Sequence, residues 1–139
     1  MLKITVTPQF SDLDGLRHVN NNIIGRWFEL GRNDLFKLFT PDLEVTHEKW
    51  KLIMLRSEYD FLEQIFYGHD VEIRTYILHI GTTSFIFGNE AWQDGKMKAK
   101  GSSVIVHFDY IKQSKMPIPE DIKKELAKHL IKEEDIGKI

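Results

Sequence analysis

The chain has 139 residues, 42% hydrophobic and 29% charged, so it is long enough to form one domain with a substantial core. Its formal net charge of −2 offers no basic footprint, which argues against nucleic acid as the main partner. The absence of cysteine excludes disulfides, thiolate zinc sites and a cysteine nucleophile, and makes a cytoplasmic location the expectation. We expect no membrane association, because no stretch approaches ~20 apolar residues and the first residues lack a signal peptide's apolar run.

The first third of the chain predicts a strand and then one long helix. Residues 2–9 alternate like a strand, and residues 21–39 carry a broad apolar face at helical spacing, as expected of a helix wrapped by a sheet. Gly31 interrupts that face, where Ala would favour the helix by about 1 kcal/mol, so we expect another backbone to approach it closely. Glu29 and Arg32 lie one turn apart and are expected to form an ion pair.

Four strand-like segments follow the helix, which Pro41 ends. The first, at residues 50–61, is apolar on both faces over its first half, and this predicts a contact with another subunit. The next two are residues 70–80 and 83–93, and Asp94-Gly95 after them is a strong hairpin signal.

The last long segment, residues 97–110, changes its apolar parity, which predicts a β-bulge near Gly101. Pro119-Glu120-Asp121 is a good helix start, and the thin apolar stripe behind it comprises Ile122, Leu126 and Leu130. The charged end, residues 132–139, is expected to fray. The pattern as a whole predicts an α+β domain.

One short turn, residues 10–21, places two carboxylates, an imidazole and two amides directly ahead of the predicted helix. A helix start carries unpaired N–H groups and a positive partial charge, so it can stabilise an oxyanion on a carbonyl substrate. The alternative interpretation is that Asp12, Asp14, Asn20 and Asn21 make only turn and capping bonds. Spacing alone favours the turn-and-capping interpretation, since turns rich in Asp and Asn are common.

The run Phe10-x-Asp12-Leu13-Asp14-x-x-x-His18-Val19-Asn20-Asn21, followed by Trp27-Phe28-Glu29-x-x-Arg32, resembles the signature of hotdog-fold thioesterases. Within that superfamily it is similar to the 4-hydroxybenzoyl-CoA thioesterase-like group and to acyl-ACP thioesterases. Later segments continue the likeness in order, so the resemblance implies a single hotdog domain over residues 1–139. It implies a curved antiparallel sheet wrapped around one long central helix, with a short C-terminal helix. It also implies a homodimer or a dimer of dimers, with active sites between paired subunits.

The resemblance assigns roles to individual residues. Asp14 matches the carboxylate that acts as nucleophile or general base in thioester hydrolysis, whereas Asp12 is expected to cap the turn. His18 matches a histidine that could orient Asp14, position water or donate to the thioester, and an imidazole can perform each task. The backbone N–H of Asn21 or a neighbour is the expected oxyanion donor. The expected substrate is an acyl-CoA or acyl-ACP thioester.

The sequence departs from the family pattern at two positions. Leu16 stands where related acyl-ACP thioesterases have an asparagine of their catalytic set, and Ile24 replaces a tyrosine in the first helical turn. A further candidate carboxylate is Glu63, which strand parity would point inward unless a bulge intervenes, although a solvated strand-end charge is an equal alternative. The remaining histidines show no metal-ligand spacing, and we expect neither a bound metal nor a cofactor.

Two other functions compete with a thioesterase. A non-catalytic acyl-CoA-binding or regulatory module on the same scaffold would fit the changes at Leu16 and Ile24, since fold does not fix function. A hotdog hydratase or dehydratase is a weaker match, because its Asp/His arrangement is absent from the sequence.

Overall fold

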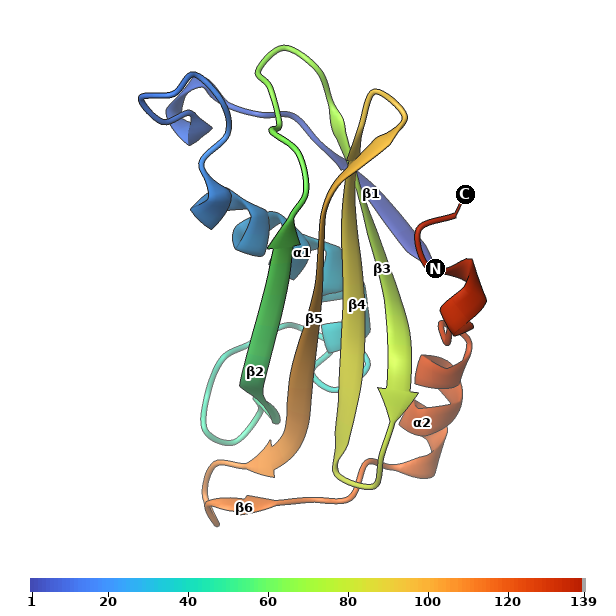
Figure 1. Ribbon diagram of the computed structural model, residues 1–139. Helices are drawn as coiled ribbons and strands as arrows, with labels where there is room; N and C mark the ends of the chain where they lie inside the picture. The colour runs from blue at the N-terminus through green and yellow to red at the C-terminus, as the bar shows by residue number, and fades with distance from the viewer. Residues whose placement is uncertain (139) are drawn as a thin grey trace.

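The computed structural model describes residues 1–138 and contains a six-stranded antiparallel sheet, two α-helices and two short 3-10 helices (Figure 1). The strands pair in the order β1-β3-β4-β5-β2, with β6 on β5. In chain order the elements are β1 (Leu2–Val6), η1 (Phe10–Asp12), α1 (Asn21–Phe36), β2 (Leu52–Phe61), β3 (Val71–Ile80), β4 (Ser84–Gln93), β5 (Lys96–Asp109), β6 (Ser114–Lys115), α2 (Glu120–Ala127) and η2 (Glu133–Asp135).

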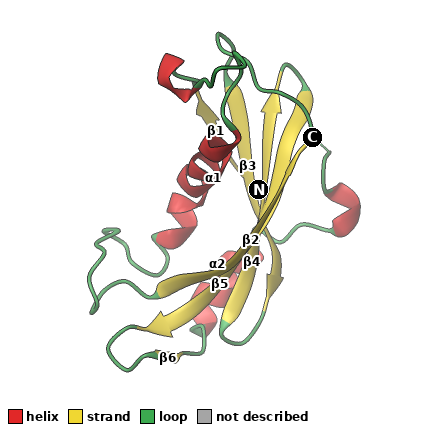
Figure 2. Ribbon diagram, turned by 60° about the vertical axis from the view of Figure 1, so that its left-hand side comes forward, coloured by secondary structure: helices red, strands yellow, loops and turns green. Residues whose placement is uncertain are grey.

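Helix α1 crosses one face of the twisted sheet, which is called the inner face below (Figure 2). Gly31 lies at the closest approach, because a Cβ there would stand 2.5 Å from Thr75 Oγ1 and 3.0 Å from Ile73 Cγ2. Gly31 is a packing glycine as predicted, but side chains of β3 approach it rather than another backbone. The α+β class and the hotdog architecture, one long helix held by a curved antiparallel sheet, are also confirmed.

Two predicted elements end earlier than expected. β1 stops at Val6 rather than at residue 9, because Pro8 cannot donate to a strand ladder. α1 ends at Phe36, and residues 37–39 form a tighter turn in which Leu38 N donates to Leu35 O at 3.1 Å and Phe39 N to Phe36 O at 3.0 Å. The hairpin at Asp94-Gly95 forms as predicted, with φ of 53° and 75°.

The bulge predicted near Gly101 lies three residues earlier in β5, at Lys98, which is the extra residue between the pairs Ala91–Ala99 and Trp92–Met97. Gly101 lies in regular register between Tyr59 of β2 and Asn89 of β4, and the register shifts lie elsewhere, between Met54 and Arg56 of β2 and opposite the Ala91–Trp92 step. The odd-numbered residues of β5 face α1 from Ala99 onward. The extra residue at Lys98 accounts for the parity change after Met97. The position was misjudged because Gly, Ser and His occupy the inner positions 101, 103 and 107, so the larger apolar residues there lie on the opposite face.

The core on the inner face consists of two apolar clusters. The first surrounds the start of α1, and its buried members are Val19, Ile24, Trp27, Phe28, Ile65, Val71, Ile73, Ala91 and Ala99. The second surrounds the end of α1 and α2, and its buried members are Leu35, Phe36, Leu52, Ile77, Phe85, Phe87, Ile105, Ile118 and Leu126. The core residues predicted on α1, β3 and β4 are therefore largely confirmed.

The two edges of the sheet differ. Strand β3 is covered by β1 along its first half, and beyond it by residues 129–131, where Ile77 N donates to His129 O at 2.8 Å and Ile131 N to Ile77 O at 3.0 Å. Leu130 thus belongs to this edge segment rather than to α2, contrary to prediction. Among the described residues, β2 pairs with β5 alone, so its other edge is open.

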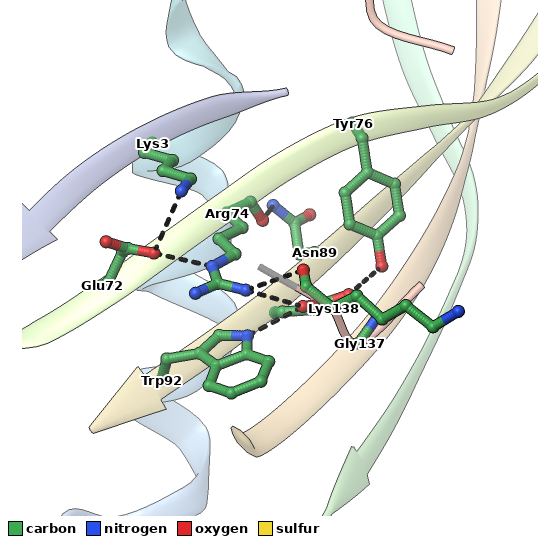
Figure 3. A network of polar contacts seen from close by, with 9 residues as sticks. Lys3, Glu72, Arg74, Tyr76, Asn89, Trp92, Gly137 and Lys138 are labelled. Atoms are coloured by element: carbon green, nitrogen blue, oxygen red, sulfur yellow. Dashed lines mark hydrogen bonds and ion pairs between the residues drawn. The ribbon is translucent and has the colours of Figure 1, made fainter. Parts of the chain in front are cut away.

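The C-terminal segment lies on the outer face of the sheet and is bonded to it (Figure 3). Gly137 N donates to Glu90 Oε2 at 3.0 Å, and Arg74 Nη1 donates to Lys138 O at 3.2 Å. Residues 133–135 form η2. The expectation that residues 132–139 fray is therefore wrong over 132–138, because a buried carboxylate holds this segment, and Ile139 lies outside the described residues.

Candidate active site

A tight turn places Asp14 and His18 side by side ahead of α1. Asp14 N donates to His18 O at 3.1 Å, Arg17 N donates to Asp14 O at 3.1 Å, and Leu13 and Val19 form an antiparallel bridge behind them. The turn needs a left-handed residue, which is Arg17 at φ 67°. Two of the residues predicted from the motif are thus brought together by backbone hydrogen bonds.

Asp12 caps the loop, as its expected role requires. Its Oδ2 accepts from Gln9 N at 2.7 Å, and its carbonyl accepts from Asn20 N at 2.9 Å. It also lines a hollow of about 450 Å³ between the end of β1 and α1, which Asp14 and His18 do not line. Asp12 therefore fixes the loop through one carboxylate oxygen, Oδ2, while its Oδ1 has no donor among the described residues.

The Asp14 carboxylate is half-buried and only partly occupied. Its Oδ1 accepts from Leu16 N at 2.9 Å, whereas no described residue donates to Oδ2. The first bond fixes the orientation of the carboxylate, as in an Asx-turn. The second oxygen is available to a water molecule or a substrate.

One ring nitrogen of His18, Nε2, has no partner among the described residues. Its Nδ1 lies 3.2 Å from Val19 O, and a carbonyl can only accept, so we assign the proton of the neutral ring to Nδ1. In this tautomer Nε2 is an acceptor, and it becomes a donor when the ring is protonated.

The start of α1 leaves one amide free. Asn20 is the N-cap: its side chain accepts from Asn22 N at 2.9 Å and its carbonyl from Ile23 N at 2.9 Å. The Asn21 N–H, at the first helical position, has no acceptor among the described residues. The loop after β2 braces this turn, because Val19 N donates to Ile65 O at 2.8 Å.

Glu63 does not point inward as its strand parity suggested, because β2 ends at Phe61. Its side chain is 50% exposed and forms an ion pair with the buried Lys98, Oε2 to Nζ at 2.9 Å. The hydrogen bond and charge of Lys98 lower the pKa of the Glu63 carboxyl. This partner on β5 supports the strand-end interpretation of Glu63 over a catalytic one.

The predicted Glu29–Arg32 ion pair does not form. Arg32 is 2% exposed and points into the core, where Nε donates to Asn89 Oδ1 at 3.1 Å and Nη2 to Ser103 Oγ at 2.9 Å. Burial lowers the pKa of the guanidinium, and the neighbouring phenol of Tyr59 opposes that shift. The sequence signal for a buried Arg32 was its position on the apolar stripe, four residues after Phe28 and three before Leu35.

Tyr59 is a residue near this site that the sequence analysis did not single out. Its hydroxyl lies beside the second turn of α1, 3.3 Å from where a Cβ of Gly25 would stand. Figure 1 shows the end of β2, which carries Tyr59, next to the first turns of α1. The register shift at Met54/Arg56 decides which side chains of β2 face the helix, and no local pattern reveals that shift.

Over residues 1–138, no three His, Cys, Asp or Glu side chains are grouped to hold a metal ion. Within the same part of the chain, no helix is long and apolar enough to cross a membrane.

Comparison with known families agrees with this geometry. The family model described as the thioesterase-like superfamily matches residues 8–126, which include the motif turn, α1 and the four long strands. The chain belongs to the thioesterase-like superfamily. No curated protein matches it.

Solved structures show the same fold. This thioesterase-like chain is 40% identical to a predicted thioesterase from Bacillus stearothermophilus, with a TM-score of 0.90 over 94% of this chain and 97% of that one. It is 29% identical to a thioesterase from Thermus thermophilus, complexed with coenzyme A and Zn, with a TM-score of 0.79 over 90% and 96%. A thioesterase superfamily structure from a Jannaschia species is 25% identical, with a TM-score of 0.80 over 91% and 81%. Thioester hydrolase activity is the general function that these matches support.

Proposed function

We propose that the protein hydrolyses acyl thioesters with Asp14 as the catalytic carboxylate and the Asn21 amide as oxyanion donor. The observation that carries the proposal is a half-buried carboxylate with one free oxygen, in the turn that leads to the free first amide of a buried helix. Acyl transfer from sulfur requires these two groups.

Two routes use the same atoms. As a general base, Asp14 takes a proton from water, the hydroxide attacks the thioester carbon, and the C–S bond breaks to release the thiol and the acid. As a nucleophile, Asp14 attacks the thioester carbon and the C–S bond breaks to release the thiolate, which leaves a mixed anhydride; water then hydrolyses the anhydride to the acid and the Asp14 carboxylate. In either route charge develops on the carbonyl oxygen, and the Asn21 N–H would stabilise it with the positive end of α1 behind it. The Nε2 of His18 can orient the attacking water or protonate the leaving thiolate.

The active site would be completed by a second copy of the chain along the open edge of β2. This edge exposes a row of large apolar side chains, comprising Ile53, Met54, Leu55 and Phe61. Leu55, at the register shift, is 68% exposed. An unpaired strand edge with apolar side chains is a template for antiparallel pairing with an identical strand. Because β2 leads into the loop that braces Val19, the seam between two copies would border the Asp14 turn.

We propose acyl-CoA as the preferred substrate, with acyl-ACP as the alternative carrier. The support comes from the Thermus thermophilus relative, which was solved with coenzyme A. A small carrier reaches a narrow seam without needing a protein-docking surface.

The test is steady-state hydrolysis of a panel of acyl-CoAs, followed with a thiol-trapping dye, for the wild type and Asp14→Asn. Loss of the carboxylate should lower the rate on the order of 10²-fold or more, because Asn can neither take a proton nor attack. Asp12→Asn is the matched control, since Asp12 caps the loop nearby. No turnover by the wild type, or full activity in Asp14→Asn, would refute the proposal.

A non-catalytic acyl-binding function is favoured by one observation. Leu16 is 76% exposed and only its amide contacts Asp14, so the side-chain bond that an asparagine would offer is lost. Stabilisation of the protein by acyl-CoA without turnover would support this second candidate.

A further inference from the structure

A polar network crosses the inner face of the sheet between the two apolar clusters. Asn89 Nδ2 donates to Thr75 Oγ1 at 2.8 Å, Arg32 bonds Asn89 and Ser103, and Ser103 Oγ lies 3.0 Å from Ser57 Oγ. We call Thr75, Asn89, Arg32, Ser103 and Ser57 the inner polar network. It runs from β3, deep in the fold, to Ser57 on the open edge strand β2.

The charge of this network is not compensated within the described residues. Arg32 is 2% exposed, and no carboxylate oxygen of residues 1–138 lies within 4.0 Å of its guanidinium. Asn89 Oδ1, Ser103 Oγ and the face of the Phe87 ring, 5.8 Å away, are neutral partners. A buried cation with neutral partners projects positive potential toward its least covered side. That side is the edge strand.

Tyr59 stands between Arg32 and this edge. Its ring covers Gly101, where a Cβ would lie 2.8 Å from Cδ1, and packs on Phe28 with centroids 5.9 Å apart. Its hydroxyl lies beside Gly25, whose missing side chain leaves the space. Burial lowers the pKa of the Arg32 guanidinium, and a side-chain hydrogen bond with the Tyr59 phenol opposes that shift, so Arg32 lies against the phenol oxygen. No described residue accepts a hydrogen bond from the Tyr59 hydroxyl.

Tyr76 also covers a glycine, and its hydroxyl has a structural hydrogen-bond partner. Tyr76 lies over Gly88 on the outer face, and its hydroxyl donates to Glu90 Oε2 at 2.7 Å. Tyr59 has the same relation to Gly101 but lacks such an acceptor, and it is half-buried on an edge strand. Gly101 explains why an aromatic ring packs at position 59, but it does not explain why that ring carries a hydroxyl group.

We propose that the Tyr59 hydroxyl, held at Gly25 and backed by Arg32, donates a hydrogen bond to an oxygen on the acyl group of the substrate. This inference rests on the proposed thioesterase function and names its substrate class. Gly25 follows Asn21 by four residues, about 6 Å along a helix axis. If the thioester carbonyl binds the Asn21 amide, the Tyr59 hydroxyl contacts the acyl group about four carbon–carbon bonds beyond that carbonyl. The enzyme then prefers acyl groups with a hydrogen-bond acceptor there.

Discrimination follows from the cost of an unpaired hydroxyl. A plain aliphatic acyl group of equal length would cover the hydroxyl without bonding it, and a buried polar group without a partner is unfavourable. The expected preference in kcat/KM is about 10-fold, the usual size of one such loss.

The experiment compares 5-oxohexanoyl-CoA with hexanoyl-CoA, which have equal chain length and differ by one ketone. The wild type should prefer the oxo substrate about 10-fold in kcat/KM, and Tyr59→Phe should bring the ratio close to one. Tyr67→Phe is the matched control, because Tyr67 is also in this end of the fold but packs outward on Phe10, and it should keep the wild-type ratio. Adipoyl-CoA distinguishes the kind of oxygen: a higher kcat/KM than for the oxo substrate assigns the site to a carboxylate, and a lower one assigns it to a neutral oxygen.

The same pair as non-hydrolysable thioether analogues separates this inference from the proposed function. If their dissociation constants differ about 10-fold in the wild type and not in Tyr59→Phe, Tyr59 reads the acyl oxygen even without turnover. Equal affinity and equal kcat/KM for the pair in the wild type, or a preference that survives in Tyr59→Phe, would overturn the inference while leaving Asp14 hydrolysis intact.

Discussion

Two buried arginines, one on each face of the sheet, have opposite surroundings. Arg74 on the outer face lies against Glu72, with Nε 2.6 Å from Oε1, and 3.9 Å from Glu90, and its guanidinium stacks 4.1 Å over the Trp92 ring (Figure 3). Arg32 on the inner face has neutral partners among the described residues. One domain therefore buries two guanidinium groups: Arg74 lies beside carboxylates, and Arg32 has only neutral hydrogen-bond partners within residues 1–138.

The difference between the two arginines distinguishes a structural cluster on the outer face from a candidate ligand-binding network on the inner face. The outer cluster is closed: Glu90, 0% exposed, accepts from Tyr76, Trp92 and the Gly137 amide. Burial, together with the hydrogen bond and charge of Glu90, raises the pKa of the Tyr76 hydroxyl. This cluster fixes the C-terminal segment to the outer face. The inner polar network ends at the open edge of β2. A hydrogen-bonding group that lacks a partner there can bind a ligand at the proposed site.

The largest effect on stability is expected from Glu90→Ala. It leaves Arg74 without its buried carboxylate and Tyr76 and Trp92 without an acceptor, so the free energy of unfolding should fall by about 3 kcal/mol. Urea unfolding measures it, with the half-exposed Glu72→Ala as the control that should cost much less. A loss for Glu90→Ala no greater than for the control would show that the outer cluster is not a closed structural unit.

Ending the chain at Ile131 should have the next largest effect. The truncation removes the Gly137 amide and Lys138 carbonyl from Glu90 and Arg74 and exposes the outer cluster, which should cost about 2 kcal/mol. Thioester hydrolysis should persist in the folded fraction, because these residues lie on the face opposite α1. A parallel loss of activity at full folding would place the tail in the site and contradict the division between the faces.

Arg32→Met should destabilise less than Glu90→Ala, by about 1 kcal/mol. Removing a buried cation with neutral partners relieves its desolvation, while Asn89 keeps its bond to Thr75 and Ser103 its contact with Ser57. Thermal unfolding compares it with Arg56→Met, an exposed arginine on β2 that should be near neutral. A loss as large as that of Glu90→Ala would mean that Arg32 is as firmly paired as Arg74.

Glu63→Gln is expected to have the smallest effect, less than about two-fold in kcat/KM, because its exposed ion pair lies at a strand end. Since Lys98 lowers the pKa of Glu63, the pair's contribution to stability is present at neutral pH and lost as the pH falls through that lowered pKa. The rate measured beside Asp14→Asn checks this, and a comparable loss would return Glu63 to the catalytic set.

The sequence predicted the parts of the fold that depend on local pattern. The 3.6-residue stripe of α1, the alternation in β3 and the Asp94-Gly95 turn are set by neighbours along the chain, and all three formed. The bulge was misplaced because Gly101 and Ser103 occupy inner positions of β5, and their reason lies on other elements: the ring of Tyr59 and the guanidinium of Arg32. Contacts between residues on different elements cannot be inferred from the local sequence pattern.

The candidate site divides in the same way. Asp14, His18 and Asn21 lie within eight residues, so a contiguous motif could assemble them, and the structure places Asp14 beside His18 ahead of the Asn21 amide. Tyr59 follows Asn21 by 38 positions, yet its side chain lies beside the same helix. A register shift in β2 sets its direction, and only the pairing of β2 with β5 reveals that shift. The sequence left two interpretations of Glu63 open, because its partner Lys98 lies on a different strand.

The most direct test of the central claim, that Asp14 performs the chemistry, is the ratio of kcat/KM for wild type and Asp14→Asn on an acyl-CoA that the wild type hydrolyses. The account predicts a ratio on the order of 10² or more, with both proteins unfolding at similar temperatures. An Asp14→Asn variant that hydrolyses the thioester as fast as the wild type would contradict it.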